Sequence, residues 1–314
     1  KAFQKEREMA IYIVGSLNMD LVIRAPRMPE GGETISGEGF MTNPGGKGAN
    51  QAVAVAKSGG EAHMVGCVGR EFGAELLGAL AQYGVGAEYV RREEDISSGI
   101  AVIVVADGDN RIILDAGSNA RTDRALIDVA LAQSKPGDYL LVQLEIALPV
   151  VAYALKQAKR RGMVTVLNPA PAAQLSADVY AFCDWFVPNQ TEAQFYTGIY
   201  PSDEESIRRC AGKLGELGVR NVLITLGTDG SACVSDGKFY RTEAVPAKAV
   251  DTTAAGDTYV GAFVTRLSEG ADVARAMRFA STASALTVTQ RGAQCAIPLR
   301  AQTQAYAVEK GVDI

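Results

Sequence analysis

A turn of small residues followed by a carboxylate occupies positions 250–258, which read VDTTAAGDT. The stretch after it has apolar residues at i, i+3, i+4 and i+7, the spacing of a helix, at Val260, Phe263, Val264 and Leu267. A helix beginning at such a turn presents unbonded N–H groups and a partial positive charge, which suit an anion. Asp257 is then either an N-cap worth about 1 kcal/mol or a carboxylate base beside an anion hole. The local pattern leaves both interpretations open.

A glycine-rich segment at 43–51, NPGGKGANQ, and several polar residues after apolar runs are further candidates. Glycine lets a backbone approach a ligand closely, although the segment could equally be an ordinary loop before a helix. Ligands of open α/β sheets bind where the carboxyl ends of the strands meet. The polar residues that follow predicted strands are Asn18, Asp20, Glu145, Asn189, Glu192 and those of 225–230. Each alone is more often a loop residue, but their shared position favours one site.

Several chemistries are excluded or weakened. The only histidine is His63, in a predicted strand, so zinc sites built from several histidines are impossible and His63 is expected to be structural. The chain contains no GxxxxGK[ST], no GxGxxG after its first strand and no GxSxG. If the protein is an enzyme, its base is therefore expected to be a carboxylate or a lysine.

The composition limits the class of protein and the partners it can have. The 314 residues are 47% hydrophobic with a net charge of −5, which predicts a globular fold and no nucleic-acid partner. No apolar run reaches the roughly 18 residues that span a bilayer, so no membrane partner is expected. Five scattered cysteines suit free thiols in a reducing cytoplasm, the expected location. The charged segment 1–9 is expected to be a tail and lacks the apolar core of a secretory signal.

Apolar runs that predict strands alternate with helical stretches. Strands are predicted at 10–15, 62–68, 139–144, 164–167, 185–187 and 222–226, and helices at 49–57, 71–83, 150–161 and 204–217. This alternation predicts an α/β fold with a mostly parallel sheet and helices on both faces. Two segments, 20–44 and 99–115, interrupt it with β-like pieces and are expected to form a small sheet. A flap over a site is favoured over a decorative edge sheet.

Taken together, these segments resemble the ribokinase (PfkB) family of carbohydrate kinases over about residues 10–298. The resemblance rests on GGKGAN at 45–50, NQTE at 189–192 and DTTAAGDT at 251–258. GSLNMD at 15–20 and QLE at 143–145 resemble the ribose kinases of the family more than its fructose or adenosine kinases. The resemblance implies a kinase domain at 10–300 and a C-terminal tail segment at 301–314. It also implies a three-layer α/β/α sandwich with a doubly wound sheet, a β-sheet lid and a homodimer paired through the lids.

The resemblance further implies transfer of the ATP γ-phosphoryl group to O5 of D-ribose, with Asp257 removing the hydroxyl proton. The backbone amides of Ala254, Ala255 and Gly256 would form the anion hole. The positions matching sugar-binding residues are Asn18, Asp20, Gly46, Lys47, Asn50 and Glu145. Those matching nucleotide-binding residues are Thr225, Gly227, Gly230 and Gly256, while Asn189 and Glu192 would place Mg²⁺ and phosphates through water.

A monovalent cation, usually K⁺, activates such kinases, and Asp251, the Thr253 backbone and the neighbourhood of Gly292 match its site. Ala296 departs from the pattern because many relatives have a serine there, so one oxygen ligand is missing. Two other functions remain open: a family kinase for 2-deoxyribose, another sugar or a nucleoside, and a non-catalytic sugar sensor. The intact Asp257 and its turn argue against the sensor.

Overall fold

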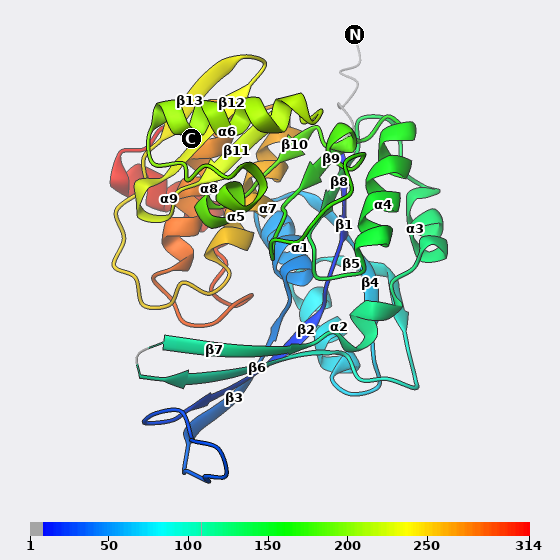
Figure 1. The fold of residues 1–314 in the computed structure, drawn as a ribbon, viewed down its shortest axis with the longest axis vertical. Coiled ribbons are helices and arrows are strands. Elements are labelled where there is room, and N and C mark those ends of the chain that lie inside the picture. The colour runs from blue at the N-terminus through cyan, green and yellow to red at the C-terminus, as the bar shows by residue number, and fades with distance from the viewer. Residues whose placement is uncertain (1–8, 108) are drawn as a thin grey trace.

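The protein is described here by a computed structural model that covers residues 9–107 and 109–314 (Figure 1). The tail expected at 1–8 lies outside the described residues. A nine-stranded sheet forms the centre, in the order β13-β12-β11-β10-β9-β8-β1-β4-β5. Its strands are β1 (Ala10–Val14), β4 (Glu61–Val68), β5 (Gly86–Arg92), β8 (Tyr139–Val142), β9 (Val164–Leu167), β10 (Trp185–Phe186), β11 (Asn221–Thr225), β12 (Ser231–Ser235) and β13 (Lys238–Thr242). All pairings are parallel except those of the β11–β12–β13 edge, which are antiparallel.

Helices cover both faces of this sheet, as Figure 1 shows. They are α1 (Lys47–Lys57), α2 (Gly73–Gln82), α3 (Arg124–Leu131), α4 (Leu148–Arg160), α5 (Gln190–Thr197), α6 (Glu204–Glu216), α7 (Ala255–Ser268), α8 (Val273–Thr287) and α9 (Arg300–Lys310). The side chains of β1, an interior strand between β8 and β4, alternate between two cores. Tyr12 and Val14 pack with α3, α4 and α6, whereas Ile11 and Ile13 pack with α1, α2, α7 and α8. A strand apolar on both faces must be covered on both, so the predicted three-layer sandwich is confirmed.

The two interrupting segments form a second sheet, in the order β3-β2-β6-β7, which projects from the body in Figure 1. Its strands are β2 (Asn18–Arg24), β3 (Glu38–Gly45), β6 (Gly99–Ala106) and β7 (Asp109–Asp115). The central pair, β2 and β6, runs parallel although the segments are far apart in sequence. Asn18, at the start of β2, pairs with Gly45 on one side and Gly99 on the other. The base of the small sheet is therefore anchored where β1 ends.

Elements that sequence patterns did not predict lie mainly toward the C-terminus. β12 and β13 form a hairpin whose turn, Asp236-Gly237, has positive φ at both residues, as a tight hairpin turn requires. The region 301–314, expected as a tail segment, contains most of α9. This helix packs on α8 and buries Thr303 and Ala307.

His63 lies in β4 as predicted, and its surroundings support a structural role. Its ring stacks on Tyr12, and its two nitrogens lie 2.5 Å from Glu88 Oε1 and 3.2 Å from Glu61 Oε1.

Among the described helices, none has the length and apolar character to cross a membrane.

Candidate active site

Polar residues from five separate segments gather at one cavity of about 220 Å³. They lie at the start of α1, after β9, β10 and β11, and at the start of α7. Lys47, Asn168, Asn189, Glu192, Thr225 and the segment 254–257 all line it. Strands β9, β10 and β11 are parallel, so their carboxyl ends meet at the same edge of the sheet. Asn189, Glu192 and Thr225, which lie at or after the ends of these strands, thus line the same cavity.

Asp257 lies in the first turn of α7, but it is not the N-cap. That position belongs to Ala254, which has φ +60° and makes no side-chain cap. A left-handed conformation costs a non-glycine residue about 1–2 kcal/mol, and such strain is typically retained at functional sites. The plain N-cap interpretation of Asp257 is therefore wrong. Its carboxylate instead accepts hydrogen bonds from Asn50 Nδ2 at 3.0 Å and Gln51 Nε2 at 2.9 Å.

The turn before α7 presents backbone groups to the cavity. The N–H of Ala255 is donated to the Thr252 carbonyl at 3.2 Å, while within the described residues the Gly256 N–H has no backbone partner. Gly256 also lines the cavity, and a Cβ there would meet nothing within 4 Å. The amides of the turn are thus unequal: that of Gly256 is available to an anion, whereas that of Ala255 already has an acceptor.

The residues expected to bind sugar converge beside Asp257. Glu145, after β8, accepts hydrogen bonds from Ser16 Oγ at 2.5 Å and from the Lys47 N–H at 3.1 Å. Asp20 packs against Gly45, where a Cβ would come within 2.5 Å of its carboxylate oxygen. Gly46, the N-cap of α1, has φ +89°, and a Cβ there would be 2.7 Å from the backbone nitrogen of Asn18. Both glycines are required by these close approaches.

Two buried amides on the sugar side, Asn50 and Asn18, are incompletely hydrogen-bonded within the protein. Asn50 Oδ1 is buried and has no partner among the described residues, although its Nδ2 reaches Asp257. Asn18 Oδ1 accepts a bond of 2.7 Å from Asn119 Nδ2, which leaves the Asn18 amide group as a donor. The acceptor on Asn50 and the donor on Asn18 are groups that suit the hydroxyl groups of a sugar.

Asn119 was not predicted from the sequence, and it is what orients Asn18. It lies on the 3₁₀ turn Gly117–Arg121, is 1% exposed, and also accepts from the Leu17 N–H at 2.9 Å. Gly99 has no room for a side chain, because a Cβ would be 2.1 Å from Asn18 Oδ1 and 2.2 Å from Asn119 Nδ2. No local pattern marks Asn119, since only the fold brings residues 18, 99 and 119 together.

The carboxylates at the site influence one another strongly. Burial raises the pKa of Asp20 to about 7, and the nearby charges of Glu145 and Asp257 act in the same direction. Burial would lower the pKa of Lys47, but Asp257, Glu145 and Glu192 more than offset this, so its pKa is raised. Lys47 is therefore a stable cation among acidic groups, and Asp20 is the group most easily protonated near neutrality.

Asn189 and Glu192 form a capping box at the start of α5. Each side chain accepts the other residue's backbone N–H at 2.8 Å. Burial raises the pKa of Glu192, although the bond from Asn189 and the charge of Lys47 oppose this. The box stabilises the helix and also directs two oxygen-bearing side chains at the cavity.

Gly227 and Gly230, expected to bind nucleotide, lie in the turn after β11 and do not line the cavity. Gly230 has φ +86°, and a Cβ there would be 2.0 Å from the Thr242 carbonyl oxygen. The hairpin with β12 and β13 therefore requires this glycine whether or not a nucleotide binds. Thr225 is the member of this group that reaches the cavity.

The expected cation site joins the loop before α7 to the loop after α8. Asp251 accepts from the Thr253 N–H at 2.9 Å, from Thr253 Oγ1 at 2.6 Å and from the Gly292 N–H at 3.0 Å. Burial raises the pKa of Asp251, but these hydrogen bonds outweigh it and leave the pKa lowered. Ala296, which follows Gly292 closely in the sequence, is buried and offers no side-chain oxygen. In the part of the chain that is described, no three His, Cys, Asp or Glu side chains cluster as metal ligands.

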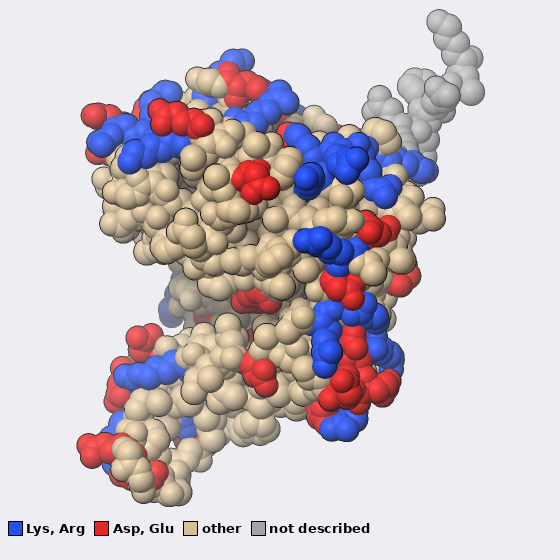
Figure 2. Space-filling model, turned by 45° about the vertical axis from the view of Figure 1, so that its right-hand side comes forward, with Lys and Arg blue, Asp and Glu red and all other residues tan. Residues whose placement is uncertain are grey.

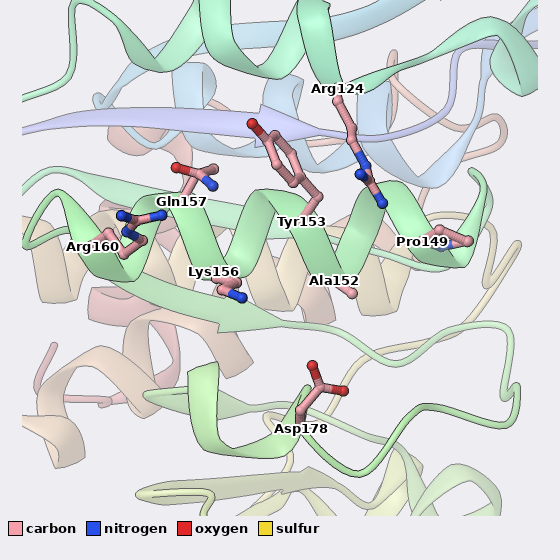
Figure 3. Close-up of a pocket in the computed structure, with 8 residues that line it drawn as sticks. All are labelled: Arg124, Pro149, Ala152, Tyr153, Lys156, Gln157, Arg160 and Asp178. Atoms are coloured by element: carbon pink, nitrogen blue, oxygen red, sulfur yellow. The ribbon is translucent and has the colours of Figure 1, made fainter.

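A second hollow of about 320 Å³ lies over α3 and α4, on the face of the sheet away from α1 and α7 (Figure 3). Arg124, Lys156 and Arg160 rim it and are exposed, and Tyr153 donates its hydroxyl to Asp128. These are exposed surface side chains rather than a buried polar site.

Figure 2 shows a hollow between the body and the small sheet.

The fold and site define a class of protein that comparison with known sequences also identifies. Residues 10–300 match the pfkB family carbohydrate kinase profile. The chain therefore belongs to the pfkB family of carbohydrate kinases, which are phosphotransferases acting on an alcohol group.

Relatives named as ribokinase and deoxyribokinase are similar to this chain over nearly its whole length. The chain is 42% identical to a ribokinase of Schizosaccharomyces pombe over 92% of this chain and 94% of that protein. It is 35% identical to a deoxyribokinase of Salmonella typhi over 95% and 98% of the two chains. The structure of Arabidopsis thaliana ribokinase complexed with ribose and ATP superposes with a TM-score of 0.89, at 31% identity, over 96% of this chain and 99% of that one.

Proposed function

We propose that the protein is an ATP-dependent kinase that transfers the γ-phosphoryl group to O5 of D-ribose, giving D-ribose 5-phosphate and ADP. The observation that carries this is the position of Asp257. Its carboxylate is held by two amides at the cavity edge, beside the helix turn whose Gly256 amide is available. The ribokinase relatives support ribose as the acceptor.

In this mechanism the chain's residues position groups and stabilise charge. Asp257 takes the proton of the attacking hydroxyl, and the hydroxyl oxygen attacks the γ-phosphorus as the bond to the ADP oxygen breaks. The N-terminus of α7, where the Gly256 amide is available, stabilises the negative charge of the phosphoryl oxygens. Lys47, a half-buried cation, adds to this field. Asn18, Asp20, Asn50 and Glu145 bind the sugar hydroxyls.

Mg²⁺ fits this site as an ion that keeps its water and phosphate ligands, because the described carboxylates form no closed cage. Asn189 and Glu192 would hold it through water, and when bound it neutralises phosphate charge. A monovalent cation, K⁺, fits the anionic carboxylate of Asp251 together with the backbone oxygens of residue 253 and of the loop at 292. Bound there, the ion would hold the turn before α7 in place, and Ala296 offers it no side-chain oxygen.

The small sheet is proposed to act as a lid and as the contact of a homodimer. Phe40, Ile112, Ile113 and Leu114 lie on its strands and are more than half exposed. Exposed apolar residues gathered on one element are typical of interaction sites. A lid closed over the sugar excludes water and so suppresses ATP hydrolysis.

A second candidate, 2-deoxyribose, is favoured by the deoxyribokinase relative. The two sugars differ only in the 2-hydroxyl. A site that binds this hydroxyl through a buried carboxylate discriminates strongly against the analogue that lacks it. Asp20, held at the base of the small sheet, is the proposed partner.

ADP release with D-ribose, Mg²⁺-ATP and K⁺, beside a no-sugar control, tests the proposal. Fast release that depends on ribose, with kcat/KM at least about tenfold above that for 2-deoxyribose, supports it. A preference for 2-deoxyribose would transfer the assignment to the second candidate. No release above the control with either sugar would overturn both assignments.

A further inference from the structure

The two oxygens of the Asp257 carboxylate are held by neighbouring residues of α1 with different surroundings. Asn50 is 6% exposed, and its Oδ1 has no partner among the described residues. Gln51 is fully buried and does not line the cavity. We propose that Gln51 is a positioning residue for the reaction, and that a buried chain of amides, Gln143–Gln51–Asn168, fixes the orientation of the Asp257 carboxylate. The inference rests on the proposed role of Asp257 as base.

The amide chain is continuous, and of its three members Asn168 alone lines the cavity. Gln51 Nε2 donates to Asp257 Oδ1 and to Asn168 Oδ1, both at 2.9 Å. Gln51 Oε1 accepts from Gln143 Nε2 at 2.5 Å. Gln51 and Gln143 are 0% exposed and Asn168 is 8% exposed. Three elements contribute, since Gln51 lies on α1, Gln143 follows β8 and Asn168 follows β9.

The two flanking amides determine which way Gln51 faces. Asn168 Nδ2 donates to the Val187 carbonyl at 2.8 Å, so Asn168 must turn its oxygen toward Gln51. An ionised carboxylate can only accept, so Asp257 also requires the NH₂ group of Gln51. The oxygen of Gln51 then faces Gln143, which must supply a donor. All three contacts therefore require Gln51 to turn its NH₂ group toward Asp257 and Asn168 and its oxygen toward Gln143.

This direction is maintained at a cost to stability. Once Gln143 has turned its NH₂ group toward Gln51, its Oε1 has no partner within the described residues. A buried acceptor without a partner destabilises the folded state. It fits only because position 15 is glycine, where a Cβ would lie 2.1 Å from that oxygen. An apolar pair of similar size would avoid this cost, so stability alone does not account for the network.

The network has a chemical consequence for the base. The two amide donors hold both oxygens of the Asp257 carboxylate in place beside Asp20 and Glu145. They also occupy one acceptor direction of each oxygen and leave the others for the sugar hydroxyl. Because Gln51 does not reach the cavity, its removal should change turnover more than sugar binding.

The test replaces the donor with an acceptor of the same shape. Gln51→Glu places a second carboxylate against Asp257, and we expect kcat at pH 7 to fall about 100-fold, within the range of general-base effects. The KM for sugar should stay within about threefold. The acid limb of the kcat–pH profile should move up by at least about one pH unit, since like charges favour protonation.

Gln143→Glu extends the test to a residue that touches neither Asp257 nor the cavity lining. It removes the donor that fixes Gln51, so we expect the acid limb to move in the same direction and kcat to fall about tenfold. Gln304→Glu adds the same charge on the exposed face of α9 and should leave both unchanged. If Gln51→Glu does not fold, Gln143→Glu carries the test.

A purely structural role predicts a different result. Variants would then melt at lower temperature and show less active protein, but the surviving activity would keep the wild-type pH profile. An unmoved acid limb in the folded variants overturns the inference. All variants are assayed with whichever sugar the wild type phosphorylates, so failure of ribose as substrate overturns only the proposed function.

Discussion

The floor of the site and the small sheet beside it are stabilised in opposite ways. The floor, where α1 meets α7, buries polar side chains and satisfies nearly all of them with one another. The small sheet instead leaves large apolar side chains at Phe40, Ile112 and Ile113 in solvent. A buried, hydrogen-bonded network is preorganised before any ligand arrives. The small sheet has unburied area that a ligand, a second copy or the body can still cover.

From this contrast we expect residues of the floor to determine the rate of phosphoryl transfer and the small sheet to control access to the sugar site. Changes in the floor should then act on turnover, whereas changes at the junction of the two regions should act on sugar binding. Changes on the outer strands of the small sheet should act mainly on association. The following predictions test this division.

The largest effect is expected from Asp257→Asn in the floor. The amide keeps the shape of the side chain but cannot accept the hydroxyl proton, so kcat should fall by about 10³-fold or more. Sugar binding, measured by calorimetry, should stay within about threefold. A variant that retained wild-type turnover would exclude Asp257 as the base.

At the junction, Asn119→Asp should raise the KM for sugar by about tenfold with little change in kcat. The new carboxylate can still accept from Leu17, but it cannot donate to Asn18 Oδ1. Loss of one directed hydrogen bond in a buried site is worth about 1–2 kcal/mol. Steady-state kinetics measure this. An effect confined to kcat would place Asn119 with the floor instead.

The raised pKa of Asp20, about 7, predicts how sugar binding depends on pH. Below pH 7 the free protein increasingly carries neutral Asp20, which is a poorer acceptor for hydroxyl groups. The KM for sugar should therefore rise as pH falls, by up to about tenfold per unit. In Asp20→Asn this dependence should disappear. A flat KM in the wild type from pH 5.5 to 8 would contradict the prediction.

The same shift predicts a change in the stability of the sugar-free protein. The folded state holds its Asp20 proton up to about pH 7, whereas the unfolded chain releases it near pH 3.8. Between these values the folded state binds more protons, so this group's contribution to the free energy of unfolding decreases as pH rises. Chemical denaturation at pH 5 and pH 8 should show Asp20→Asn gaining stability relative to the wild type at the higher pH.

The smallest effect on catalysis is expected from Ile113→Lys on β7. Ile113 is 73% exposed, so the free energy of unfolding should change by less than about 0.5 kcal/mol. Association should weaken, which sedimentation velocity over a range of concentrations would measure. Gln304→Glu, exposed on α9, is the control. Identical sedimentation of variant and wild type would argue against pairing through this sheet.

Residue patterns predicted the floor better than the junction. The helix after 250–258, the glycine segment at 43–51 and the polar residues after strands are local signals, and the structure brings them to one cavity. Asn119 and Asn168 carry no such signal, because each matters only through a partner distant in sequence. The N-cap alternative for Asp257 was decided by the backbone of Ala254, whose positive φ no neighbouring residue type announces.

By itself, the sequence determined that the chain has a two-sided apolar sheet, helices to cover it, and a carboxylate at a small-residue turn. These follow from periodicity and from the conformational preferences of single residues. Only the tertiary structure decided which amide faces Asp257, which carboxylate is protonated near neutrality, and which glycines are indispensable. Those properties depend on distances between segments up to 207 residues apart. Hydrogen-bond direction and desolvation act only once the chain has brought such groups into contact.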